Sequence, residues 1–142
     1  MKTGLEIKIL WIDDHALGLL ISGSNGTFAG SAEMYAPRDI LTKITAAIQG
    51  FPSSPGDERT FEIGTFAGAY DGGGARLHLF CEDSLGHAAI EVTIKTDSYD
   101  RSRPESAQFT IPVVAAVIDD FVARLGKIPL EAGAAVELYL SN

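Results

Sequence analysis

The alternation of apolar and polar side chains at every second residue most constrains the fold of this chain. It is clearest over residues 88–95, where one face would carry Ala88, Ile90, Val92 and Ile94 and the other Ala89, Glu91, Thr93 and Lys95. Because successive side chains of a strand point to opposite faces, this period predicts a strand with one buried and one solvated face. Such strands are typical of antiparallel sheets.

The same alternation recurs along most of the chain. It predicts strands at 5–12, 15–22, 27–35, 60–66, 75–82, 88–95, 107–111 and 135–140. Short polar or glycine-containing segments, such as Asn25-Gly26, join several of these strands. Connections of this kind predict hairpins and therefore antiparallel pairing.

Two segments follow a helical period instead. The first is expected to open at Pro37 and stop at Gly50, and the second to open at Pro112 and stop at Gly126. Their apolar stripes are Ile40, Leu41, Ile44 and Ile48 in the first, and Val114, Val117, Ile118, Phe121, Val122 and Leu125 in the second. A helix with one apolar stripe must lie against another layer. The expected fold is therefore α+β, a mainly antiparallel sheet of about seven to eight strands with two amphipathic helices packed on it.

Length and charge limit the classes of function. A chain of 142 residues predicts a single domain, 1–142. A net charge of −8 disfavours nucleic acid and anionic membranes and suits a basic protein partner, although it also serves solubility alone. With no apolar stretch long enough to span a bilayer and no signal-peptide pattern at residues 1–6, a cytoplasmic protein is expected. Homo-oligomerisation is left open.

The run Asp13-Asp14-His15 is the first candidate for chemistry, because carboxylates beside an imidazole can bind a cation or transfer a proton. Consecutive residues do not converge on one point, and aspartate is favoured in turns, so a turn is the better interpretation.

Asp119-Asp120 lies within the second helix, at positions that the apolar stripe leaves exposed. This pair is expected to be a solvated helix surface.

Cys81 and the histidines near it form the second candidate. His78 falls on the opposite face of its strand from Cys81, so the two cannot act as a nucleophilic pair. Cys81 shares a face with Leu77 and Leu79, which predicts a buried, inert thiol. If residues 83–86 form the connecting loop, His87 lies opposite Glu82 and His78 lies opposite Glu91. This register predicts two histidine–carboxylate pairs and no metal site.

The remaining motifs indicate no chemistry. Asp71-Gly72-Gly73-Gly74 lacks the lysine and the following helix of a phosphate loop, so it is interpreted as a flexible hairpin connection. No catalytic residue, cofactor or metal ligand is predicted, which favours binding over catalysis, and the binding residues are unknown. The aromatic candidates for an interface are Trp11 and Tyr139, with Trp11 expected in the core beside Leu5, Ile7 and Ile9.

One pentapeptide occurs twice. Gly26-Thr27-Phe28-Ala29-Gly30 recurs as Gly64-Thr65-Phe66-Ala67-Gly68. Because each half of the chain also contains one predicted helix, an internal duplication is one interpretation. Coincidence, combined with shared strand-end chemistry, is the other.

Two longer stretches carry a family resemblance. They are residues 26–31 leading to Gly50-Phe51-Pro52, and residues 86–92 leading through 109–112 to Ile118-Asp119-Asp120-Phe121. In these stretches the chain resembles small bacterial proteins, some of which are labelled WapI-type immunity proteins and neutralise a toxin made by the same cell. The resemblance implies a small acidic binder and carries over no functional residue. The expected function is a non-catalytic protein-interaction module, and by resemblance an immunity protein. The alternative is a small-ligand-binding or enzymatic domain whose site is assembled from distant residues.

Overall fold

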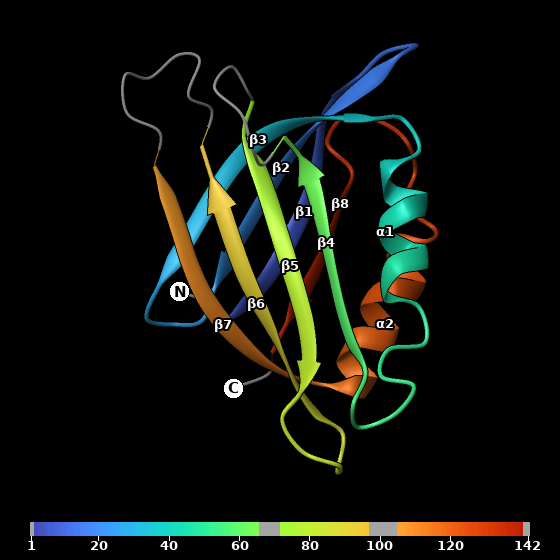
Figure 1. Ribbon diagram of the computed structural model, residues 1–142. Coiled ribbons are helices and arrows are strands. Elements are labelled where there is room, and N and C mark those ends of the chain that lie inside the picture. The colour runs from blue at the N-terminus through green and yellow to red at the C-terminus, as the bar shows by residue number, and fades with distance from the viewer. Residues whose placement is uncertain (1, 66–71, 97–104, 141–142) are drawn as a thin grey trace.

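The computed structural model describes residues 2–65, 72–96 and 105–140, which form eight strands and two helices (Figure 1). Their order is β1 (Gly4–Ile12), β2 (Ala16–Ser24), β3 (Ala29–Pro37), α1 (Ile40–Ile48), β4 (Glu58–Gly64), β5 (Gly74–Cys81), β6 (His87–Lys95), β7 (Ser106–Val114), α2 (Ala115–Leu125) and β8 (Ala135–Tyr139). All neighbouring strands pair antiparallel. The α+β class and the number of strands are therefore confirmed.

The strands form two sheets, so the expectation of a single sheet is wrong. Sheet A has the strand order β3-β2-β1-β8, and sheet B has the order β4-β5-β6-β7. Figure 1 shows sheet B in front of sheet A, and β3 contacts all four strands of sheet B. Two sheets form because each has one apolar face, and the two faces bury one another.

A single hydrophobic core fills the space between the sheets and the helices. The inner positions of sheet A are Leu5, Ile7, Ile9, Leu17, Leu19, Ile21, Ala32, Met34, Ala36, Val136 and Leu138. Those of sheet B are Ile63, Ala75, Leu77, Leu79, Ala88, Ile90, Val92, Ile94, Phe109, Ile111 and Val113. The helices add Ile40, Leu41, Ile44, Ile48, Ile118, Phe121, Val122 and Leu125. The apolar residues of the strands and of both helices thus meet in one core, except that Val114, predicted on the stripe of the second helix, ends β7 and is 43% exposed.

The helices close one side of the sandwich and do not cover a sheet face. α1 contacts β4 and α2, while α2 also contacts β7 and β8. Figure 1 shows the helices one above the other beside the sheets. Among the described elements, none covers the outer face of sheet A. Neither helix in the described part of the chain is long and apolar enough to cross a membrane.

The chain contains the same order of elements twice, with an exchange of strands. Each half consists of three antiparallel strands, a helix and a fourth strand. The fourth strand of each half joins the sheet of the other half, so β4 pairs with β5 and β8 pairs with β1. The repeated pentapeptide does not follow this repeat. Its first occurrence spans the β2–β3 turn and the start of β3, whereas the second begins at the end of β4, and residues 66–68 lie outside the described residues.

The predicted helix starts are wrong by a few residues in both halves. Pro37 is the last residue of β3 and Pro112 lies within β7, with the helices beginning at Ile40 and Ala115. Both strands lie at sheet edges, where proline removes no hydrogen bond of the ladder. The predicted stops are confirmed. Gly50 follows the end of α1 with φ +77°, and the Gly126 N–H donates to the Val122 carbonyl 3.0 Å away.

Candidate functional site

Asp13-Asp14-His15 forms the β1–β2 turn. Oδ1 of Asp13 accepts hydrogen bonds from the backbone N–H groups of His15 (2.8 Å) and Ala16 (2.9 Å). These two bonds lower the pKa of the Asp13 carboxyl below its usual value. The carboxylate therefore stabilises the turn. Across the described ranges, no cluster of three or more His, Cys, Asp or Glu side chains is placed to bind a metal.

His78 has the predicted neighbour but a different side-chain partner. It lies opposite Glu91 in the β5–β6 ladder, as the register predicted. Its Nε2 is 2.7 Å from Oε1 of Glu58 on β4, on the outer face of sheet B. Its ring also lies 5.2 Å from the Phe80 ring. The contacts of His78 are those of a cross-strand pair.

His87 lies at the other end of the β5–β6 hairpin. The backbone N–H of Glu82 donates to its carbonyl oxygen at 2.8 Å, which confirms the predicted pairing of these residues. The side chain instead contacts Asp83, with Nδ1 2.6 Å from the carboxylate. This contact is the main cause of a lowered pKa of the Asp83 carboxyl. Because His78 and His87 have separate acidic partners, the two histidines do not form one site.

Cys81 is less buried than predicted. It is the last residue of β5 and is half-buried, with Sγ 3.7 Å from the Ser54 carbonyl oxygen. It does pack against the core on the same face as Leu77 and Leu79. The full burial expected from strand alternation fails because this residue lies at the end of the sandwich.

Two further candidates have structural roles. Asp119 and Asp120 are exposed on α2, as predicted, and Asp120 forms an ion pair of 3.0 Å with Arg124 one turn later. Asp71 lies outside the described residues. Gly73 is packed so closely on β3 that a Cβ atom there would overlap the Glu33 carbonyl oxygen. The interpretation of this glycine as a merely flexible connection missed that contact.

Trp11 is not in the core, because β1 contains a bulge. Ile9 pairs with Leu19, but the register then shifts, and Trp11 pairs with Gly18. The extra residue, Leu10, turns the indole to the outer face of sheet A, where it is 37% exposed. Alternation alone does not reveal such an insertion, so the prediction that placed Trp11 beside Ile9 is wrong.

The indole forms part of an aromatic and aliphatic surface. Gly18 lies between Trp11 and Tyr35 in the sheet, and the two ring centroids are 5.7 Å apart at an interplanar angle of 58°. Tyr35 is 62% exposed. Together with their neighbours these residues line a hollow of about 490 Å³. We define the Trp11 surface as Leu10, Trp11, Gly18, Leu20, Glu33 and Tyr35.

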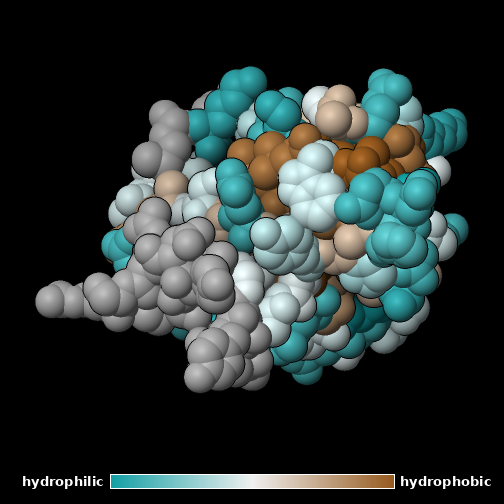
Figure 2. All heavy atoms as spheres, turned by 90° about the horizontal axis from the view of Figure 1, so that it is seen from above, coloured by the Kyte–Doolittle hydropathy of each residue, from teal (hydrophilic) through white to brown (hydrophobic). Residues whose placement is uncertain are grey.

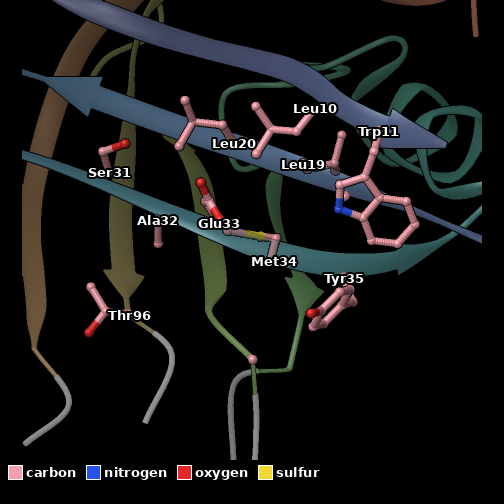
Figure 3. Close-up of a pocket in the computed structure, with 12 residues that line it drawn as sticks. Leu10, Trp11, Leu19, Leu20, Ser31, Ala32, Glu33, Met34, Tyr35 and Thr96 are labelled. Carbon is pink, nitrogen blue, oxygen red and sulfur yellow. The ribbon is translucent and has the colours of Figure 1, made fainter. Parts of the chain in front are cut away.

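A close view shows the residues of this surface (Figure 3), and a space-filling view shows the hydropathy of the upper end of the molecule (Figure 2). In Figure 3, Trp11 lies beside Tyr35 at one end of the hollow, with Leu10, Leu20 and Glu33 farther along the strands. Figure 2 shows hydrophobic residues gathered at the upper end of the molecule, next to weakly polar ones and bordered by hydrophilic ones. An apolar centre with a polar border is the usual composition of a protein-binding site.

The outer faces of the two sheets differ in how their charges are paired. On sheet B, Arg76 donates two hydrogen bonds to Oε2 of Glu62, at 2.7 and 2.9 Å. On sheet A, Glu6 lies directly opposite Glu137. The pKa of Tyr139 on the same face is raised by burial first, and then by these two carboxylates. Like charges opposite one another destabilise a sheet, so the arrangement on sheet A does not serve stability.

Comparisons with protein-family models, curated proteins and solved structures found no match to this chain.

Proposed function

We propose that this chain is a non-catalytic protein-interaction module that binds its partner through the Trp11 surface. The observation that carries the proposal is the exposed indole of Trp11, which a bulge turns out of the core and which lies on Gly18 beside Tyr35. Tryptophan and tyrosine are the side chains that most often dominate the binding energy of an interface. Their exposure here gives a partner an apolar anchor point.

A protein partner is favoured over a small substrate. The volume of the hollow, about 490 Å³, falls within the range of ligand pockets. However, the two rings that border it, Trp11 and Tyr35, are 37% and 62% exposed. A pocket for a small ligand encloses most of the ligand's surface, whereas this hollow is open to solvent along its aromatic side. The alternative function, a small-ligand-binding or enzymatic domain, therefore has weaker support.

We further propose that the partner is a basic toxin and that the chain is an immunity protein. Two features support this step: the resemblance to WapI-type immunity proteins, and the net charge of −8, which attracts a basic surface. The test is co-expression with the protein encoded beside this gene. If that protein inhibits growth, the wild-type chain should restore growth. Co-expression without rescue would contradict the immunity role.

Binding of the same neighbouring protein, measured by calorimetry, tests the surface itself. Trp11→Ala and Tyr35→Ala should each weaken binding by at least about 30-fold, because each removes an anchor worth about 2 kcal/mol or more. The matched control is Phe28→Ala, since Phe28 is as exposed as Tyr35, 62%, but lies in the β2–β3 turn outside the Trp11 surface. Unchanged affinity in both Trp11 and Tyr35 variants would refute docking through this surface.

A further inference from the structure

The hollow of the Trp11 surface combines aromatic walls with a carboxylate. Tyr35 and Glu33 are two residues apart on β3, so their side chains extend from the same face of the strand. Leu20 lies opposite Glu33 and Gly18 lies opposite Tyr35 on the neighbouring strand. An apolar floor, two aromatic rings and one acidic group therefore line a single hollow. This combination of groups suits a cation that is only weakly hydrated.

Two other aromatic rings of the protein are already in contact with a cationic side chain of the same chain. Lys2 Nζ lies 4.6 Å from the centroid of the Tyr139 ring, and the guanidinium of Arg59 lies 5.6 Å from that of Phe51. Within residues 2–65, 72–96 and 105–140, no such contact involves Trp11 or Tyr35. The Glu33 carboxylate likewise has no ion pair within these ranges. Among the described residues, the aromatic rings and the carboxylate of the hollow thus lack a cation of the chain itself.

We infer that the hollow receives an arginine side chain of the partner protein, an inference that rests on the proposed function. Because the two rings are inclined by 58°, a planar guanidinium can stack on one of them, Trp11 or Tyr35, and donate two parallel hydrogen bonds to the Glu33 carboxylate. A lysine ammonium is more strongly hydrated and cannot stack, so it fits this hollow less well. The negative charge of the chain attracts a basic partner, and this hollow gives one arginine of that partner a defined place.

Fluorescence of the intact protein tests the inference directly. Trp11 is the only tryptophan of the chain, so its emission reports on the hollow alone. We expect N-acetyl-arginine amide to change this emission saturably, with a dissociation constant on the order of 10 mM, as befits a single side chain. N-acetyl-citrulline amide has nearly the same shape but no charge, and it should bind at least about 5-fold more weakly.

The variant Glu33→Gln separates the charge from the shape of the hollow. It should weaken binding of the arginine amide by at least about 5-fold and leave binding of the citrulline amide unchanged. Glu131→Gln is the matched control, because Glu131 is exposed in the α2–β8 connection away from the hollow. Circular dichroism of each variant verifies that the fold is intact.

The inference and the proposed function can fail separately. Equal binding of the arginine and citrulline amides, no saturable change with the arginine amide, or an unchanged affinity in Glu33→Gln would each overturn the arginine site. If one of these results is obtained but the neighbouring protein still binds in a Trp11-dependent manner, only the arginine site is refuted. The proposed function then stands. Conversely, selective arginine binding supports the site even if that neighbouring protein does not bind.

Discussion

The indole of Trp11 occupies the space that a side chain at residue 18 would need. A Cβ atom built on Gly18 would overlap three indole atoms, including Nε1. The contact joins the bulge of β1 to the middle of sheet A, because Trp11 and Gly18 are paired across the two strands. An exposed tryptophan is thereby held in one place against the sheet. Pre-organisation of this kind lowers the entropic cost of binding a partner.

Gly18→Ala should displace the indole without unfolding the protein. We expect a changed emission spectrum of Trp11, binding weakened as in Trp11→Ala, and a loss of about 1 kcal/mol in the free energy of unfolding, since the indole can move into solvent. Fluorescence and urea denaturation measure these effects. Gly56→Ala is the control, because a Cβ atom there would meet no atom within 4 Å. An unchanged emission spectrum in Gly18→Ala would show that the indole does not lie on this glycine.

Gly73→Ala should destabilise the fold more than Gly18→Ala does. A Cβ atom at residue 73 would overlap the carbonyl oxygen of Glu33 and lie 3.0 Å from that of Lys95. Backbone atoms cannot move aside as a side chain can, so we expect a loss of about 1–3 kcal/mol in the free energy of unfolding. Urea denaturation measures this loss, with Gly56→Ala as the control. A loss no larger than that of the control would mean that β3 and the β4–β5 connection are not in close contact.

Phe121→Ala should cost about 3–5 kcal/mol of folding free energy, because the ring is buried in the core and its removal leaves a cavity. Phe28→Ala removes the same atoms from an exposed position and should change stability by less than about 0.5 kcal/mol. Denaturant titrations of the two variants give the comparison. A change below about 1 kcal/mol for Phe121→Ala would place this helix outside the core.

Asp57 connects α1 to sheet B and should make stability depend on pH. Its carboxylate binds Arg59, which also donates to the carbonyl oxygens of Ala47 (3.2 Å) and Gln49 (2.7 Å) at the end of α1. The Arg59 side chain, and next the backbone N–H of Ser53, lower the pKa of Asp57 from 3.8 to about 2. The folded state therefore favours the ionised form. Its contribution to stability is complete above about pH 4 and is lost as the pH falls towards 2.

The variant Asp57→Asn tests this linkage. Its melting temperature should lie below that of the wild type near neutral pH, and the difference should shrink as the pH falls from about 4 to about 2. Asp120→Asn is the control, since the Asp120–Arg124 pair is exposed and contributes little at any pH. A difference between wild type and Asp57→Asn that stays constant with pH would contradict the assignment, as would an NMR titration of Asp57 near 3.8.

Local patterns predicted much of this structure. The alternation around Ile90 and Glu91 marked the buried face of β6 correctly, although Ala89 on the predicted wet face is also buried. The stripe containing Phe121 marked the buried side of α2. The register that paired His78 with Glu91 is also confirmed. Each of these features depends on residues that are close in the chain, or on one short hairpin, so the periodicity of side chains was sufficient to predict them.

The candidate site could not be predicted in the same way. Its central residue, Trp11, continues the alternation of Ile7 and Ile9 in the sequence, and only the pairing of β1 with β2 shows the shift that turns it outward. A signal was nevertheless present in the sequence, because Gly18 interrupts the apolar run from Ala16 to Ile21. A glycine at such a position often indicates a bulge or a close approach of another group.

By itself, the sequence determined which side chains are apolar at a strand or helix period, and therefore most of those that are buried. The tertiary structure decided which strands share a sheet, that β4 and β8 join the sheet of the opposite half, and that Trp11 is exposed. The physical reason is that strand pairing joins residues far apart in the chain, as between Ile7 and Val136, and no local pattern selects one distant apolar strand over another.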